Sequence, residues 1–130
     1  MYALDTNTVV DFFRGAGRVA ERLLATPPIE VAIPSIVLYE LEVGIARSGN
    51  VERRREQLRE LVTRSALLTF GPREAEASAR LRTELERRGE PIGPLDTLIA
   101  GTALARGAML VTHNTREFGR VPGLQIVDWY

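Results

Sequence analysis

Residues 2–14 read Y-A-L-D-T-N-T-V-V-D-F-F-R, a short apolar run that ends at Asp5 and passes directly into a helical pattern. The pattern continues to Arg14 and stops at Gly15, a residue type that commonly follows the last turn of a helix. This stretch predicts a strand over residues 2–4 and a helix over residues 6–14. Asp5 at the junction can cap the helix, can belong to a functional site, or can do both.

The same alternation continues along the chain. Further helices are predicted over residues 18–25, 35–49, 51–64, 72–89 and 94–105, and further strands over residues 31–33, 67–70, 109–112 and 125–127. The strands are short and apolar, and helices separate them, which is typical of a mostly parallel sheet covered on both faces. We therefore expect an α/β fold, with residues 1–130 forming a single domain.

The composition narrows the possible functions. The chain has no cysteine, one histidine and 17 basic residues that are all arginine, with a formal net charge of zero. These counts argue against thiolate chemistry and histidine-rich zinc sites. The absence of lysine argues against phosphotransfer receivers and haloacid-type phosphatases, which use a lysine near the phosphate. Arginine remains well suited to RNA phosphates. No apolar run is long enough to span a membrane and no signal pattern is present, so we expect a cytoplasmic protein without a membrane partner.

Three carboxylates stand out from apolar surroundings. Asp96 is the only charge in residues 95–105, which read L-D-T-L-I-A-G-T-A-L-A, and Glu40 lies within the apolar helix predicted from residue 35. With Asp5, they suggest a site assembled for a hard cation, because isolated buried carboxylates are costly. The alternative for Asp96 is a first-turn acid that interacts with the helix dipole, and Glu42 competes with Glu40 for the inward face.

Other polar side chains cluster near the ends of the first and fourth strands. Asn114 follows the strand over residues 109–112, where its amide oxygen could bind a cation weakly or hold a water, or could serve only as a turn or capping residue. Thr6, Asn7 and Thr112 are candidate hydrogen-bond partners of the carboxylates. Ligands of open parallel sheets bind beyond the carboxyl ends of the strands. Oxygen ligands favour Mg²⁺, with Mn²⁺ as a substitute, and such sites support phosphodiester hydrolysis.

Four segments resemble the PIN-domain nucleases, specifically the VapC-type toxins of toxin–antitoxin pairs. They are L-D-T-N at residues 4–7, S-x-x-x-x-E-L-x-x-G at 35–44, P-I-G-P-L-D-T-L-I-A-G at 91–101, and L-V-T-H-N-T-R-E-F-G-R-V-P-G-L at 110–124. The resemblance implies a three-layer α/β/α sandwich in which Asp5, Glu40 and Asp96 hold Mg²⁺ and activate a water that cuts RNA. The fourth acidic position of many PIN domains falls on Asn114, so Glu117 is a candidate assistant.

The resemblance also implies partners. It predicts a homodimer, a small VapB-type antitoxin and an RNA substrate, and the late segments look most like the subgroup that cuts initiator tRNA in its anticodon stem-loop. Arg14, Arg116 and Arg120 are candidate phosphate contacts. The run at residues 53–55 could also hold phosphates, but its interleaved glutamates are more typical of a solvated helix. The alternative is a degenerate PIN domain that binds RNA or protein without catalysis.

Overall fold

The computed structural model describes residues 1–130 and contains one sheet of five parallel strands. The strands are β1 (Tyr2–Leu4), β2 (Val31–Pro34), β3 (Ala66–Leu68), β4 (Met109–Val111) and β5 (Ile126–Val127), in the order β3-β2-β1-β4-β5. Tyr2 of the central β1 pairs with Val31 on one side and with Met109 on the other. The predicted α/β class is confirmed, and every strand pair is parallel.

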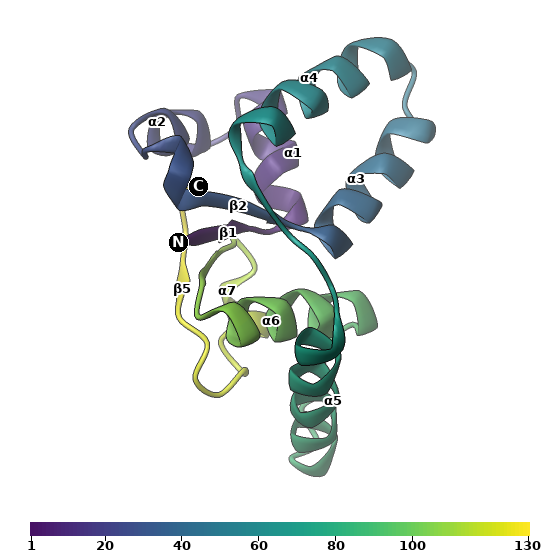
Figure 1. Cartoon of the computed structure of the whole chain (residues 1–130), viewed down its shortest axis with the longest axis vertical. Coiled ribbons are helices and arrows are strands. Elements are labelled where there is room, and N and C mark those ends of the chain that lie inside the picture. The colour runs from purple at the N-terminus through teal and green to yellow at the C-terminus, as the bar shows by residue number, and fades with distance from the viewer.

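Helices cover both faces of the sheet, as Figure 1 shows. The elements are α1 (Thr6–Arg14), α2 (Val19–Leu24), the 3₁₀ turn η1 (Pro28–Glu30), α3 (Ser35–Ala46), α4 (Val51–Arg64), α5 (Pro72–Arg87), α6 (Pro94–Arg106) and α7 (Thr115–Phe118). In the view of Figure 1, α1 to α4 lie above the sheet and α5 to α7 below it. None of the helices is both long and apolar enough to cross a bilayer.

The predicted boundaries differ from the structure by a few residues. The helix that carries Glu40 ends at Ala46, three residues before the predicted end at Gly49, and β3 covers Ala66–Leu68 instead of residues 67–70. At the start of α3, Pro34 is both the last residue of β2 and the capping residue of the helix, and Ser35 is the first helical residue. Such differences are small beside the correct order of elements.

The sheet forms the centre of the hydrophobic core and fixes where a ligand can bind. Ala3, Leu4, Ile33 and Leu110 are almost fully buried between the helical layers. The chain leaves β1 toward β2 on one side and returns to β4 on the other, so β1 and β4 flank the point where the strand order reverses. In open sheets this point opens a crevice at the carboxyl ends of the strands, and β1 ends immediately before Asp5.

Helices α5 and α6 pack closely because small residues meet at their crossing. Gly101 and Ser78 are both buried, and a Cβ atom added at Gly101 would lie 2.8 Å from the Cα of Ser78. The hydroxyl of Ser78 is buried without a hydrogen-bond partner. Any larger side chain at position 101 would therefore push α6 away from α5.

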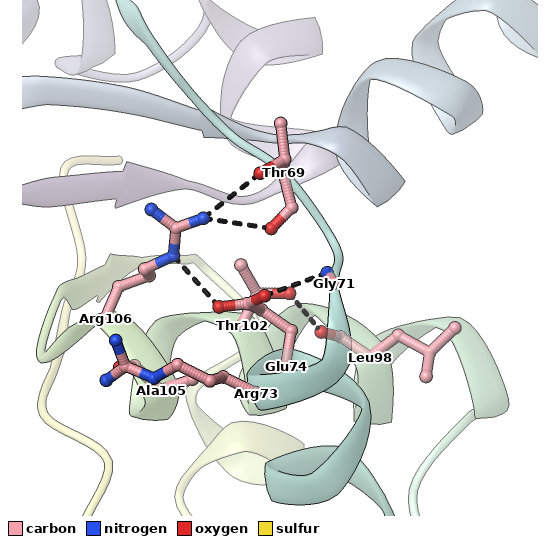
Figure 2. A network of polar contacts seen from close by, with 8 residues as sticks. All are labelled: Thr69, Gly71, Arg73, Glu74, Leu98, Thr102, Ala105 and Arg106. Atoms are coloured by element: carbon pink, nitrogen blue, oxygen red, sulfur yellow. Dashed lines mark hydrogen bonds and ion pairs between the residues drawn. The ribbon is translucent and has the colours of Figure 1, made fainter.

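A network of polar contacts fixes the other end of α6 (Figure 2). Arg106 Nε donates to Glu74 Oε2 at 3.0 Å, and its Nη2 donates to the carbonyl and hydroxyl oxygens of Thr69. The second oxygen of Glu74 accepts from the Gly71 backbone N–H at 2.8 Å, which caps α5. The Gly71 N–H and the neighbouring Arg106 hold the pKa of Glu74 below its usual value. The network thus joins α6 to the start of α5.

Candidate metal and nuclease site

Asp5 lies at the carboxyl end of β1 and is 3% exposed. Its Oδ1 accepts from the Thr6 N–H at 2.8 Å, so it caps α1, and its Oδ2 accepts from the Thr112 hydroxyl at 2.9 Å. Burial raises the pKa of Asp5 and outweighs these two hydrogen bonds, with further increases from Glu40 and Glu117. Asp5 can therefore cap α1 and also bind a ligand, because a capping carboxylate still has free lone pairs.

Glu40 reaches the same area from α3. Its Oε1 accepts from the Thr6 hydroxyl at 2.7 Å, so Thr6 connects the carboxylates of Asp5 and Glu40. Glu42, the competing residue, is exposed and faces Arg55 at 3.5 Å. The prediction that Glu40 and not Glu42 faces inward is consistent with these contacts.

Asp96 occupies the first turn of α6, as predicted, and is half-buried. Desolvation is the main reason that its pKa is raised to about 6, and the charges of Asp5, Glu117 and Glu40 raise it further. A hydrogen bond to Glu117 also favours the protonated form. Asp96 thus stands in the first turn, where the sequence placed it, but burial and the neighbouring carboxylates disfavour its charged form.

Asn114 and Glu117 act together at the end of β4. The Asn114 amide donates to Glu117 Oε2 at 2.7 Å, and the Asn114 backbone N–H donates to the Thr112 hydroxyl at 3.0 Å. Asn114 therefore positions Glu117, while the carboxylate itself reaches Asp96. The resemblance to PIN domains put Asn114 at the fourth acidic position and made Glu117 only a candidate assistant, whereas in the structure Asn114 holds a Glu117 carboxylate that acts on Asp96.

The carboxylates of Asp5, Glu40, Asp96 and Glu117, which we call the acidic cluster, have no basic partner. Seven ion pairs form in the protein, and none includes a member of the cluster. No three acidic or histidine side chains converge closely enough to ligate one ion together as they stand. The donor set nevertheless fits a hard cation, because mutually repelling oxygen donors without a counter-ion gain most from one.

The other predicted side chains differ in their distance from the acidic cluster and in their contacts. Asn7 is exposed and makes no side-chain hydrogen bond to the cluster, whereas Arg14 lines a hollow of about 230 Å³ together with Glu40 and Thr6. Arg116 is exposed without an ion-pair partner, and Arg120 donates to the Pro91 carbonyl at 3.2 Å.

Arg54 also lines the hollow beside Glu40, although sequence reasoning assigned its run of arginines to a solvated helix. The only signal in the sequence was the run itself. The glutamates interleaved with the run do not show which of its three arginines turns toward the hollow.

The PIN domain family model matches residues 2–124, nearly the whole chain. The chain belongs to the PIN-domain family. The tRNA(fMet)-specific endonuclease VapC of Salmonella typhimurium is 35% identical over 128 residues, which cover 98% of this chain and 97% of that protein. Ribonuclease VapC2 of Rickettsia felis is 40% identical over 99 residues, or 76% of this chain and 74% of that protein. These relatives confirm the predicted resemblance to VapC-type members of the PIN-domain family.

A solved structure extends the likeness to three dimensions. The crystal structure of VapBC2 from Rickettsia felis bound to a DNA fragment from its promoter matches with a TM-score of 0.92 at 35% identity, over 99% of this chain and 98% of that chain. The predicted PIN-like arrangement of a parallel sheet between helical layers is thereby confirmed.

Proposed function

We propose that this PIN-domain protein is a divalent-metal-dependent endoribonuclease that serves as the toxin of a VapBC-type toxin–antitoxin pair. The observation that carries the proposal is the acidic cluster, which gathers four carboxylates without any basic partner at the carboxyl end of β1. None of the 17 arginines of the chain forms an ion pair with this cluster. The negative charge of the cluster is therefore left for an external cation to balance.

In this proposal Asp5, Glu40 and Asp96 hold Mg²⁺, and Mn²⁺ can replace it. A bound divalent ion lowers the pKa of water and neutralises charge on the leaving oxygen of a phosphodiester. Thr6 and Thr112 orient the carboxylates of Asp5 and Glu40 through the hydrogen bonds described above. Glu117, held by Asn114, adds a fourth carboxylate beside Asp96 and so increases the attraction for the ion.

The proposed substrate is tRNA, with the anticodon stem-loop of initiator tRNA as the first candidate. A relative 35% identical over nearly the full length is named a tRNA(fMet)-specific endonuclease. Arg14 and Arg54 line the hollow next to Glu40, where their guanidinium groups can bind RNA phosphates. Arg116 and Arg120 remain predicted RNA contacts, although Arg120 also holds the Pro91 carbonyl.

The proposed partner is a VapB-type antitoxin. An apolar groove of about 460 Å³ lies between α1, α2 and α4, and Phe13 lines both this groove and the hollow beside Glu40. An antitoxin segment in the groove could therefore continue toward the acidic cluster. The family's homodimer stays a prediction, which the molar mass of the antitoxin-free protein in solution would test.

The decisive experiment incubates the antitoxin-free protein with total tRNA in the presence of Mg²⁺, and in parallel with EDTA. Discrete fragments that require Mg²⁺ and disappear with Asp96→Asn would support the proposal, and end-mapping would identify the RNA. Metal binding without cleavage of any tRNA would contradict the proposed substrate. A protein that neither cleaves RNA nor binds Mn²⁺ would be the degenerate binding module, and the proposed activity would be wrong.

A further inference from the structure

Two exposed rings are stacked beyond the ends of β4 and β5. The imidazole of His113 and the ring of Tyr130 have centroids 4.3 Å apart and planes inclined by 21°. The His113 side chain is 55% exposed and Tyr130 is 48% exposed. We call these two side chains the His113–Tyr130 stack. Aromatic rings that stay this open beside a nuclease site have the chemistry of a surface on which a base can stack.

The stack is held rigidly by Asp128. One carboxylate oxygen of Asp128 lies 2.9 Å from His113 Nδ1, and the other accepts from the Tyr130 backbone N–H at 2.9 Å. Partial burial of Asp128 opposes ionisation, but the hydrogen bonds from Tyr130 and His113 outweigh it and lower the pKa of Asp128. An ionised carboxylate only accepts hydrogen bonds, so Nδ1 is the donor, and the same side chain binds the His113 ring and the Tyr130 backbone.

Gly17 gives Tyr130 its place. The Arg18 backbone N–H donates to the Tyr130 carbonyl oxygen, and a Cβ at Gly17 would lie 2.8 Å from Tyr130 Cγ. Gly17 also has a φ of +59°, a conformation that side chains other than glycine rarely adopt. The loop between α1 and α2 therefore requires glycine where Tyr130 packs.

Anchoring of the last strand does not explain the stack. Trp129 is 6% exposed and its ring packs against Tyr2 with centroids 5.2 Å apart, so the segment after β5 is already fixed to the central strand. Tyr130 adds an exposed ring beyond that anchor, and its hydroxyl makes no hydrogen bond within the protein.

The position of the stack relates it to the cluster. His113 lies between Thr112, whose hydroxyl binds Asp5, and Asn114, whose amide binds Glu117. His113 is therefore one residue along the chain from both groups, and Tyr130 packs on Gly17, beyond the end of α1 opposite to the one that Asp5 caps, so the stack lies to one side of the cluster. The exposed Arg116, without an ion-pair partner, is three residues further along the chain, close enough in sequence to supply a positive charge for a phosphate of the same strand.

We propose that the His113–Tyr130 stack binds an unpaired nucleobase of the RNA substrate and so positions the scissile phosphodiester at the acidic cluster. The inference rests on the proposed ribonuclease function. It assigns substrate positioning to two side chains and predicts that the preferred RNA has an unpaired base at a fixed distance from the cut. Stacking tolerates any base, so the selection is for an unpaired position and not for a sequence.

The test measures binding of an RNA stem-loop in EDTA, with the full chain carrying Asp96→Asn. Loop nucleotides are replaced one at a time by an abasic residue. At one loop position the abasic change should weaken binding by about 5- to 100-fold, the range for loss of one stacked base. In Tyr130→Leu and His113→Ala the intact RNA should bind correspondingly less tightly, and the abasic change at that position should have no further effect.

Tyr130→Phe is the matched control, because it keeps the ring and removes only a hydroxyl without a partner. It should bind like the parent and show the same sensitivity to the abasic position. Thermal melting of each variant shows whether the fold is intact. If Tyr130→Leu and His113→Ala lose the same affinity for every RNA, or if the abasic losses are the same as in the parent, the stack is only structural and the inference is wrong.

The outcome is separate from that of the proposed function. Cleavage of the intact stem-loop by the unsubstituted chain with Mg²⁺ tests catalysis independently of binding in EDTA. Cleavage without the coupling described above would overturn the stacking inference alone. Coupling without cleavage would support the stack and overturn the proposed catalysis.

Discussion

Asp96 is a carboxyl of the acidic cluster whose ionised form is clearly disfavoured by its surroundings. Desolvation, and after it three neighbouring carboxylates, raise its pKa to about 6, so at neutral pH the fold has to hold an ionised group that its surroundings disfavour. Replacing Asp96 with asparagine keeps the shape and removes the charge. In the metal-free protein Asp96→Asn should increase the free energy of unfolding by about 1–2 kcal/mol at pH 7, a value reduced for solvent screening at this half-buried site.

Urea unfolding in EDTA checks this expectation. Ribonuclease activity measured on the same preparation should be lost, because the substitution removes a proposed metal ligand. A variant that is less stable than the parent, or that still cleaves RNA, would contradict the role given to Asp96.

Glu40 and Glu42 provide a matched pair two residues apart on α3. Glu40→Gln keeps an acceptor for the Thr6 hydroxyl but lowers the charge of the cluster, so we expect cleavage to fall by at least about tenfold. Glu42→Gln affects only an exposed pair with Arg55 and should leave cleavage unchanged. Single-turnover cleavage rates compare the two, and equal rates would mean that the wrong face of α3 was chosen.

At the scale of single residues, the sequence was most informative where polarity contrasts with the surroundings. A lone acid in an apolar helix identified Asp96, and an acid after a strand identified Asp5. Glu117 could not be found in this way, because it follows two polar residues, Thr115 and Arg116, and its direction depends on the short helix α7. The His113–Tyr130 stack was also beyond reach, since it joins two exposed residues from the ends of β4 and β5.

Among the elements, the crossing of α5 and α6 has the least freedom. Gly101→Ala would place a methyl group 2.8 Å from the backbone of Ser78, so we expect a loss of about 1–3 kcal/mol in the free energy of unfolding. Gly44→Ala on α3 is the control, because a Cβ there meets nothing within 4 Å and should add about 0.5–1 kcal/mol through helix propensity. Chemical unfolding measures both, and equal effects would rule out a tight crossing.

The elements themselves were predicted well because local signals define them. Proline after glycine opened α5 and α6 where expected, and Val51–Arg64 agreed at both ends. The errors arose where tertiary contacts decide the end of an element. The chain turns after Ala46 with Ser48 Oγ donating to the Ile45 carbonyl, although the residues up to Gly49 are compatible with helix.

For the molecule as a whole, the raised pKa values of Asp5 and Asp96 set the direction of its pH dependence. A carboxyl whose pKa is higher in the folded than in the unfolded protein stabilises the fold when protonated, and that stability is lost as the pH rises through the folded pKa. The metal-free protein should therefore lose stability between about pH 4 and about pH 7, most steeply between the usual pKa of an aspartate and the pKa of about 6 at Asp96, where the folded carboxyl is protonated and the unfolded one is not. Below about pH 4.5 the lowered pKa values of Glu74 and Asp128 act in the opposite direction.

Unfolding midpoints in EDTA at about pH 5 and pH 7 measure this slope, and Asp96→Asn should flatten it. Adding Mn²⁺ at pH 7 should restore the stability, because the ion binds the ionised carboxylates of the folded state only. A midpoint that rises from pH 5 to pH 7 without metal would show that the cluster is not strained.

The four acids of the cluster come from positions 5, 40, 96 and 117, and Glu117 joins Asp5 because β4 pairs with β1. A chain still being translated holds Asp5 and Glu40 from an early stage, but it lacks β4 and α7 until residues 109–118 have emerged from the ribosome. We therefore expect a nascent copy to be harmless to the tRNAs that are translating it, and a truncated product to be harmless permanently. Under the proposed function, cleavage would begin only when this last part of the site has folded against β1.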